Sequence, residues 1–193
     1  MPRICVYMGS SPGSSPAYAR AARALGEEIA RSGTGLVYGG GDVGLMGVVA
    51  DAALAGGGEV IGVITDFLVA KEVAHDGLTE LHVTSGMHER KALMADLADG
   101  FIVMPGGLGT LDEAFEVLTW NQLGLIEKAT VFLDVAGFWT PLMEHLARAA
   151  DAGFVRREHL ALVRTAHTAP DAVRLALEPV PHVARAPVDH DVR

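Results

Sequence analysis

The sequence predicts an α/β fold built on a doubly wound parallel sheet, with helices on both faces. Short apolar runs alternate along the chain with longer segments whose apolar residues recur at helical spacing. The apolar runs are continuous instead of alternating with polar residues, as strands buried on both faces require. Three of the runs end in loops rich in glycine or serine. Together these patterns indicate a Rossmann-like arrangement.

The first half of the chain contains four predicted strands, at residues 4–8, 35–38, 60–64 and 81–83. Helical spacing predicts helices after the first two of them, at residues 18–31 and 45–55. The first helix places Ala21, Leu25 and Ile29 on one face, and a glycine follows its end. Residues 66–80 lack a clear period, so we expect a loop with short helical pieces there.

The second half opens with a predicted helix at residues 87–97, with Ser85 as its candidate cap. Strands are predicted at 101–104 and 129–133, and the second is the last that the pattern indicates. Further helices are predicted at residues 110–123, 141–152 and 170–177. No linker or repeat interrupts this pattern, so we expect a single domain over residues 1–178. The three prolines and missing apolar period of residues 179–193 predict a flexible tail.

The composition excludes several classes of partner. The 193 residues carry a formal net charge of -9 at pH 7, and no run of Lys or Arg stands out. Binding to a nucleic-acid backbone or an anionic membrane needs clustered cations, so we expect neither partner. No apolar run reaches the ~20 residues of a membrane span, and the start lacks a signal-peptide pattern. Because Cys5 is the single cysteine, an intrachain disulfide is impossible, and we expect a cytoplasmic protein.

Three predicted strand-to-helix junctions have a composition that suits an anion. They span residues 9–11, 39–44 and 105–110, which read Gly-Ser-Ser, Gly-Gly-Gly-Asp-Val-Gly and Pro-Gly-Gly-Leu-Gly-Thr. Parallel strands place such loops at one edge of the sheet, and glycine lets backbone N–H groups approach a ligand closely. The following helix N-terminus adds partial positive charge. Tight turns alone would explain one loop, but three at one edge indicate a phosphorylated ligand.

Gly39, Gly41 and Gly44 also match the dinucleotide pattern G-x-G-x-x-G. The pattern follows the second predicted strand instead of the first, and the nearest acidic residue at the expected distance, Asp66, lies in the irregular stretch. A mononucleotide is therefore favoured over a dinucleotide. An NAD-dependent oxidoreductase stays an alternative that a cofactor titration can test.

Carboxylates follow the third of these loops. Asp112 and Glu113 lie in the first turn of the predicted helix, and Glu116 shares a face with Glu113. Favourable charge at a helix N-terminus explains Asp112. Further carboxylates beside an anion site indicate a chemical role, such as directing a water or stabilising positive charge on a ribose.

Arg90 and Lys91 lie one turn into the helix predicted at residues 87–97. Both could be solvated cations. The fork of Arg90 nevertheless suits a phosphate or a carboxylate, and an acidic protein needs a local cation at such a site. The histidines and Cys5 have no second ligand at metal-binding spacing, so we expect no metal site.

Several longer motifs occur in a fixed order along the chain. They read CVYxGSS at 5–11, LVYGGGxxGLMG at 36–47, MxxRK at 87–91, PGGxGTxxE at 105–113 and TWNQLG at 119–124. These motifs resemble the LONELY GUY family of cytokinin-activating phosphoribohydrolases, which older names often call lysine decarboxylases. The resemblance covers about residues 3–178. Leu108 occupies a variable position of the family, and Gly86 stands where many members carry Asp.

This resemblance implies a Rossmann-like homodimer that uses neither a metal nor a redox cofactor. It implies hydrolysis of the N-glycosidic bond of an N6-modified adenosine 5′-monophosphate, or of AMP itself, to the free base and ribose 5-phosphate. By position, Arg90 and Glu113 are the catalytic pair, and Glu72 is a ligand-contacting acid. The other substrate- and phosphate-binding positions are Gly9, Ser10, Gly40, Gly41, Met87, Lys91, Gly106, Gly107, Gly109, Thr110, Asp112, Glu116 and Thr119.

Two further functions would use the same glycine-rich loops. A carrier of a phosphorylated cofactor, such as the molybdenum cofactor, would not need the pair of Arg90 and Glu113. A nucleosidase with a broader choice of base would need both residues. The motifs therefore do not distinguish it from a hydrolase specific for adenosine 5′-monophosphates. Lysine decarboxylation itself is disfavoured, because no pyridoxal-binding signature is visible.

Overall fold

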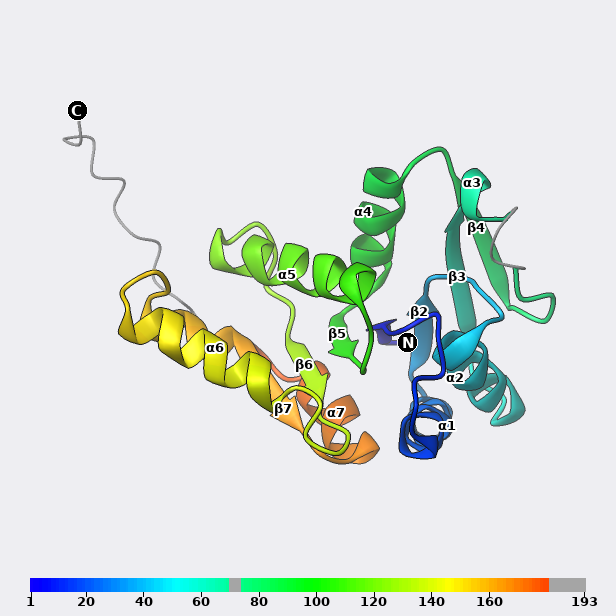
Figure 1. Ribbon diagram of the computed structural model, residues 1–193. Helices are drawn as coiled ribbons and strands as arrows, with labels where there is room; N and C mark the ends of the chain where they lie inside the picture. The colour runs from blue at the N-terminus through cyan, green and yellow to red at the C-terminus, as the bar shows by residue number, and fades with distance from the viewer. Residues whose placement is uncertain (70–73, 181–193) are drawn as a thin grey trace.

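The computed structural model describes residues 1–69 and 74–180, which form an α/β protein with one sheet (Figure 1). Its strands are β1 (Arg3–Tyr7), β2 (Gly35–Tyr38), β3 (Val60–Thr65), β4 (Glu80–Thr84), β5 (Gly100–Val103), β6 (Thr130–Leu133) and β7 (Val163–Ala166). Its helices are α1 (Pro16–Arg31), α2 (Gly44–Ala55), α3 (Asp66–Val69), α4 (Met87–Leu97), α5 (Leu108–Gln122), α6 (Thr140–Asp151) and α7 (Ala169–Ala176), with a 3-10 helix, η1 (Arg157–Leu162).

The seven strands lie in the order β4-β3-β2-β1-β5-β6-β7, and each neighbouring pair is parallel. From β1 the chain builds outward to β4, then returns to place β5 on the other side of β1 and builds outward to β7. The direction of winding therefore reverses between β1 and β5. This arrangement confirms the predicted doubly wound, Rossmann-like sheet.

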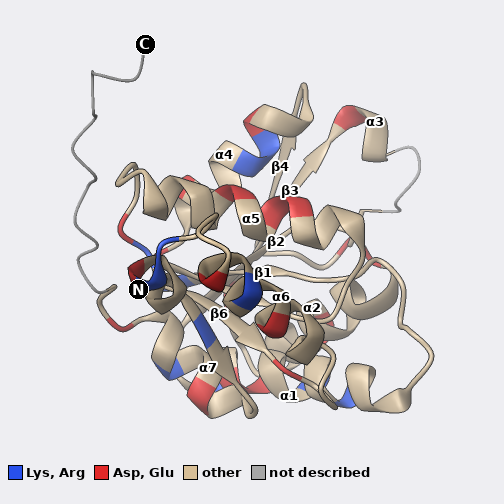
Figure 2. Cartoon of the chain, turned by 60° about the vertical axis from the view of Figure 1, so that its left-hand side comes forward, with Lys and Arg blue, Asp and Glu red and all other residues tan. Residues whose placement is uncertain are grey.

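The sheet is covered on both faces, and β1 shows how. Ile4 and Val6 join a core cluster with buried residues of α1, α2 and α7. Cys5 and Tyr7 point the other way and join a cluster with buried residues of α4 and α5. Because both faces of the strand are apolar, its sequence shows a continuous run and not an alternation. Figure 2 shows the charged segments mainly on helices and loops.

The expectation that residues 129–133 form the last strand is wrong. After α6 and η1, β7 adds a parallel edge strand next to β6. Its sequence, Val-Arg-Thr-Ala, is short and half polar, so it carries no strand pattern of its own. Arg164 of β7 donates a hydrogen bond to the carbonyl oxygen of Leu175 at 2.8 Å, which ties the strand to the end of α7. Tertiary contacts therefore stabilise a strand that local propensity does not predict.

The helix at residues 87–97 has its predicted bounds, but its predicted cap is wrong. Gly86 is the N-cap residue and makes no side-chain cap hydrogen bond. Ser85 lies one position earlier, where its backbone N–H and its hydroxyl both donate to the carboxylate of Glu89, at 3.0 and 2.8 Å.

Two predictions fall partly outside the described residues. Within the irregular stretch at 66–80, the short helix α3 is present, but Glu72 lies in the range 70–73, which is not described. Of the predicted tail, Pro179 and Val180 are described, and Val180 packs against the core cluster beside α5. The remainder, 181–193, is not described. Within 1–69 and 74–180, no helix is both long and apolar enough to span a membrane.

Candidate active site

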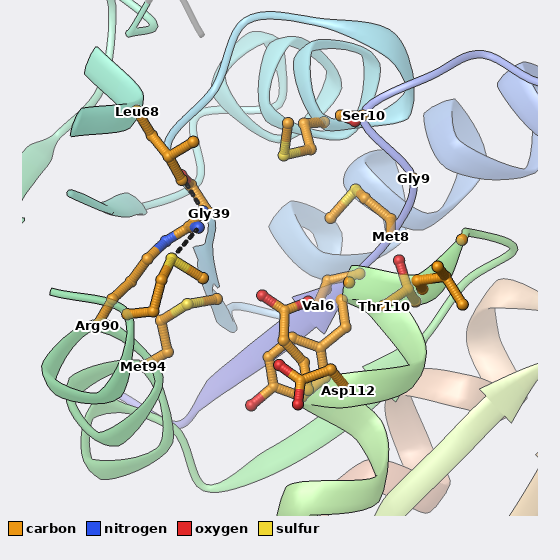
Figure 3. Close-up of a pocket in the computed structure, with 17 residues that line it drawn as sticks. Val6, Met8, Gly9, Ser10, Gly39, Leu68, Arg90, Met94, Thr110 and Asp112 are labelled. Carbon is orange, nitrogen blue, oxygen red and sulfur yellow. Dashed lines mark hydrogen bonds between the residues drawn. The ribbon is translucent and has the colours of Figure 1, made fainter. Parts of the chain in front are cut away.

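A cavity of about 330 Å³ opens at the carboxyl ends of β1, β2 and β5 (Figure 3). Open α/β sheets bind ligands in the crevice where the winding reverses, and this cavity lies at that point. Its walls are formed by strand ends, one side of α4, the start of α5, and single residues of α2 and α3. The lining residues are Val6, Tyr7, Met8, Gly9, Ser10, Gly39, Met46, Leu68, Met87, Arg90, Met94, Gly107, Leu108, Gly109, Thr110, Asp112 and Glu113.

The three glycine-rich loops meet at Gly9. Its N–H donates to the carbonyl oxygen of Pro105 at 3.1 Å, and its carbonyl accepts from the N–H of Leu45 at 3.3 Å. Two neighbouring glycines cannot be replaced without a collision. A Cβ at Gly106 would lie 2.1 Å from Thr110 Oγ1, and one at Gly44, where φ is +60°, would lie 2.3 Å from the carbonyl oxygen of Ser10. The glycines therefore allow the three loops to pack together at the edge of the sheet.

The N-terminus of α5 opens into the cavity. Gly107 is its N-cap residue and makes no side-chain cap hydrogen bond. Gly107, Leu108, Gly109 and Thr110 all line the cavity. The first N–H groups of a helix have no partner within the helix, and the helix dipole makes this end partly positive. The start of α5 is therefore suited to an anionic group.

Arg90 is held rigidly at the opposite wall. Its Nε donates to the carbonyl oxygen of Val63 at 2.8 Å. Its Nη2 donates to the carbonyl oxygen of Gly39 at 2.8 Å, a bond that Figure 3 shows. Only 6% of the residue is exposed, so the possibility of a solvated cation is wrong for Arg90. A guanidinium has five N–H donors, so a group fixed at two carbonyls still retains donors for a ligand. Arg90 is therefore a preorganised cation in the cavity wall.

Lys91 lies next to Arg90 in α4 but serves a different purpose. Its Nζ is 2.9 Å from Asp112 Oδ2 and 3.2 Å from Glu116 Oε2, both on α5. Burial lowers the pKa of Lys91, but its hydrogen bonds to these two carboxylates outweigh that effect, so the pKa lies above its ordinary value. Lys91 is buried and does not line the cavity. The solvated-cation alternative is thus wrong for Lys91 too.

Glu113 lines the cavity from the first turns of α5 and is half-buried. Tyr7, at the end of β1, lines the cavity as well and stacks on Phe101 with ring centroids 5.8 Å apart. Burial raises the pKa of Tyr7 well above its ordinary value, and the negative charge of Glu113 contributes to the rise. The phenol therefore stays neutral beside the carboxylate.

The structure brings many of the predicted site residues together, and others lie elsewhere. The cavity is lined by Gly9, Ser10, Met87, Arg90, Gly107, Gly109, Thr110, Asp112 and Glu113. Among the described residues, the predicted positions outside this lining are Gly40, Gly41, Lys91, Gly106, Glu116 and Thr119.

Three of the outlying positions have clear structural roles. Gly40, with a φ of +76°, turns the chain after β2, and its carbonyl accepts from the N–H of His75 at 3.2 Å. Gly41 forms an isolated antiparallel bridge with Ala74. The hydroxyl of the exposed Thr119 donates to the carbonyl oxygen of Phe115 within α5 at 2.7 Å. Their predicted contacts with a ligand stay predictions.

Sequence reasoning missed the apolar wall of the cavity. The missed lining residues are Val6, Tyr7, Met8, Met46, Leu68 and Met94, whereas Gly39 and Leu108 lie within the junctions 39–44 and 105–110 that were predicted to suit an anion. Some signals were present, because Tyr7 and Met8 end a strand just before a glycine-rich loop, and Met94 lies one turn after Arg90. Met8, Met46, Met87 and Met94 give the wall flexible, polarisable side chains that adapt to a planar or branched apolar group.

The donors needed for a metal site do not gather in the described part of the chain. No group of three or more His, Cys, Asp or Glu side chains there is arranged to hold a metal ion. The polar groups that the cavity offers are backbone N–H groups, one arginine, carboxylates and hydroxyls.

The fold and the cavity define a Rossmann-like α/β protein in which a helix N-terminus, an arginine and a glutamate face one cavity. The profile of a family described as "possible lysine decarboxylase" matches residues 46–176. The chain belongs to this family, which is the LONELY GUY family that the motifs resemble.

Curated relatives of the chain carry a consistent name. The chain is 51% identical over 153 residues to a cytokinin riboside 5′-monophosphate phosphoribohydrolase of Rhodococcoides fascians. The matched region covers 79% of this chain and 77% of the relative. It is 46% identical over 179 residues to an enzyme of the same name from Oryza sativa subsp. japonica, covering 93% of this chain and 74% of the relative.

Solved structures of similar fold carry a different name. The molybdenum cofactor binding protein of Rippkaea orientalis matches with a TM-score of 0.66 and 26% identity, covering 90% of this chain and 94% of that one. The molybdenum cofactor carrier protein of Chlamydomonas reinhardtii matches with a TM-score of 0.67 over 90% of this chain and 94% of its own, and at 24% identity it supports the fold alone.

Proposed function

We propose that the chain is an N-glycosyl hydrolase that releases the free base and ribose 5-phosphate from adenosine 5′-monophosphates, including cytokinin riboside 5′-monophosphates. The observation that carries the proposal is the placement of Arg90 and Glu113 in one cavity with the uncapped N-terminus of α5. The name shared by relatives at 51% and 46% identity supports the choice of reaction. A nucleoside 5′-monophosphate is therefore the proposed partner.

The 5′-phosphate would bind at the start of α5. Gly107, Leu108, Gly109 and Thr110 would present backbone N–H groups there, and Ser10 lines the same cavity. A phosphate held at this point is remote from the bond that breaks. Its binding energy can be used to hold the ribose in place for the reaction. The family positions Gly9 and Gly106 would support this loop by packing beneath it.

Glu113 would act at the anomeric carbon. Cleavage of a glycosidic bond passes through a state that resembles an oxocarbenium ion. An ionised Glu113 would stabilise that positive charge and orient a water molecule. The water oxygen forms the new bond to C1′ while the bond from C1′ to the base nitrogen breaks. The base leaves with the bonding electron pair and takes up a proton, so that water is divided between the two products.

Arg90 and the methionine wall would position the rest of the nucleotide. Arg90 is fixed by the carbonyl oxygens of Val63 and Gly39, so its remaining donors point from a rigid frame. Its positive charge would also favour the ionised form of a carboxylate in the same cavity. Met46, Met87 and Met94 would contact the base and an apolar N6 substituent.

The direct test is a product assay on a panel of nucleotides. AMP, isopentenyl-AMP, GMP and CMP are incubated separately with the protein, and free base and ribose 5-phosphate are quantified by chromatography. Adenosine serves as the matched control without a phosphate. We expect release of base from adenine nucleotides, and a much lower rate with adenosine because it lacks the group that binds α5. Equal rates with AMP and adenosine would contradict phosphate anchoring.

A phosphorylated-cofactor carrier is the second candidate, favoured by the likeness to the molybdenum cofactor binding protein of Rippkaea orientalis. A carrier would bind the phosphorylated cofactor in the cavity without catalysing a reaction. The same assay separates the two functions, because a carrier releases no adenine from AMP. A broader nucleosidase would release base from GMP or CMP at comparable rates.

The assembly is a further part of the proposal. We infer a homodimer, which the family resemblance implies. Large apolar side chains are exposed on α3 and β4 beside the cavity, namely Phe67, Val69, Leu81 and Val83. Light scattering coupled to gel filtration tests this inference, and a monomer at micromolar concentration would contradict it. Location in the cytoplasm stays a prediction.

A further inference from the structure

Lys91 is a buried cation that joins two helices. It lies on α4 with 7% of its surface exposed, and its Nζ contacts Asp112 Oδ2 at 2.9 Å and Glu116 Oε2 at 3.2 Å on α5. Figure 2 shows the basic segment of α4 and the acidic segments of α5 in the same region of the molecule. A single ammonium thus carries two ion pairs between α4 and α5.

The same two helices carry the charged pair of the cavity. Arg90 is the residue before Lys91, and Glu113 is the residue after Asp112. The ion pairs of Lys91 therefore lie one residue away from both groups that the proposed reaction uses. Any change in the separation of α4 and α5 at this point would move Glu113 relative to Arg90.

Lys91 also offsets repulsion between carboxylates on α5. Asp112, Glu113 and Glu116 lie within five consecutive residues, and Glu113 and Glu116 are neighbours at i and i+3. Like charges at such spacing disfavour the ionised form of each carboxylate. Because Lys91 contacts the two carboxylates that flank Glu113, it offsets their negative charge.

The other groups facing Glu113 do not take this role. Burial raises the pKa of both Cys5 and Tyr7 on β1 well above their ordinary values, so both stay neutral. Arg90 is the cation that lines the cavity, and its guanidinium is bound to the carbonyl oxygens of Val63 and Gly39.

We propose that Lys91 is a positioning residue: it sets Glu113 opposite Arg90 and keeps Glu113 ionised by neutralising Asp112 and Glu116. The inference rests on the proposed function and assigns Lys91 a role other than contact with the substrate. Its charge acts through α5. It follows that loss of the charge changes how turnover depends on pH, and not merely the stability of the fold.

The test is the pH dependence of kcat in Lys91→Met and Lys91→Arg. Methionine keeps the length of the side chain and removes the charge, so we expect kcat to fall about tenfold to a hundredfold. We expect the acidic limb of the pH profile to move up by about one pH unit, because Glu113 would take up a proton more readily. Lys91→Arg keeps the charge, and we expect it to restore the limb to its original position.

The matched control is Arg3→Met. Arg3 forms a comparable ion pair with Glu59, 2.8 Å between Nε and Oε2, at the opposite end of β1 from the cavity. Both methionine variants should melt at lower temperature than the wild type. Only Lys91→Met should move the acidic limb. A limb that stays in place in Lys91→Met, or a rise in KM with unchanged kcat, would overturn the inference.

A second measurement does not depend on turnover. The carboxyl carbon of Glu113 is titrated by carbon-13 NMR without substrate, with Glu113→Gln used to assign its signal. Its midpoint should rise in Lys91→Met and stay constant in Arg3→Met. If the wild type releases no base, the proposed function fails, and the NMR midpoint alone decides the role of Lys91. An unchanged midpoint rejects that role.

Discussion

Arg90 occupies the space that a side chain at Gly39 would need. A Cβ at Gly39 would lie 2.4 Å from Arg90 Nη2, and Nη2 also donates to the carbonyl oxygen of Gly39 at 2.8 Å. The two residues are 51 positions apart in the sequence. The missing side chain at Gly39 is therefore part of what fixes the guanidinium in the wall of the cavity.

We expect Gly39→Ala to reduce kcat/KM roughly a hundredfold, because the new methyl group displaces the guanidinium from its fixed position. The backbone at Gly39 has no positive φ, so the free energy of unfolding should fall by only about 1 kcal/mol, the value of a lost hydrogen bond. Steady-state kinetics and urea unfolding measure the two effects. Gly86→Ala is the control, since no atom lies within 4 Å of its added Cβ. Full activity in Gly39→Ala would show that the position of Arg90 is unimportant.

Glu113→Gln keeps the size of the side chain and removes its charge. We expect kcat to fall by about 10²–10⁴-fold, since the amide can neither stabilise an oxocarbenium ion nor accept a proton from water. Binding of AMP, measured by calorimetry, should stay close to that of the wild type, because the proposed phosphate site at the start of α5 is unchanged. Turnover at the normal rate would exclude Glu113 from the reaction.

Arg90→Lys keeps the positive charge but loses the planar fork. A single ammonium cannot reproduce the geometry that bonds the carbonyl oxygens of Val63 and Gly39 at 2.8 Å each. We expect the free energy of unfolding to fall by about 1–3 kcal/mol, because a buried carbonyl loses its partner. Activity should fall as well. A lysine variant with normal stability and normal rate would mean that charge alone suffices at this position.

His159 in η1 makes the stability of the fold depend on pH. Burial lowers its pKa from the ordinary value of 6.5, and the positive charge of Arg156 lowers it further. Arg156 Nη2 lies 3.1 Å from His159 Nε2, and in the neutral ring this nitrogen can accept a hydrogen bond from Arg156.

The sign of the effect follows from the lowered pKa. As the pH falls, the unfolded chain takes up the proton first, so the contribution of His159 is complete above pH 6.5 and is lost progressively below it. Urea unfolding at pH 7.5 and at about pH 5.5 should show this loss in the wild type and a smaller loss in His159→Gln. Equal losses in the two proteins would contradict the assignment.

A chelator should have little effect on turnover. The proposed reaction uses backbone N–H groups, Arg90 and Glu113, and the family resemblance implies no metal. We expect the rate of base release to be the same before and after dialysis against EDTA. Inhibition by EDTA that added metal reverses would overturn the metal-free mechanism.

Much of the architecture could be predicted from local patterns. The apolar runs and the helical spacing located six strands and six helices close to their final bounds, because burial on two faces leaves a clear periodicity. The strand β7 was missed, since Val-Arg-Thr-Ala has no such periodicity and is held in the sheet by its pairing with β6. A short edge strand of this kind depends on its neighbours.

The sequence by itself determined the chemical groups available to this protein: glycine-rich strand ends, a helix start suited to an anion, and the charged residues Arg90 and Glu113. These features are local, because backbone freedom and helix dipoles depend on adjacent residues. Only the tertiary structure decided which charges face the cavity. Lys91 contacts Asp112, 21 positions away, and does not line the cavity, whereas its neighbour Arg90 lines the cavity and contacts Gly39. Adjacent residues of a helix point in different directions. The packing of α4 in the fold therefore determines that Arg90, and not Lys91, faces the cavity.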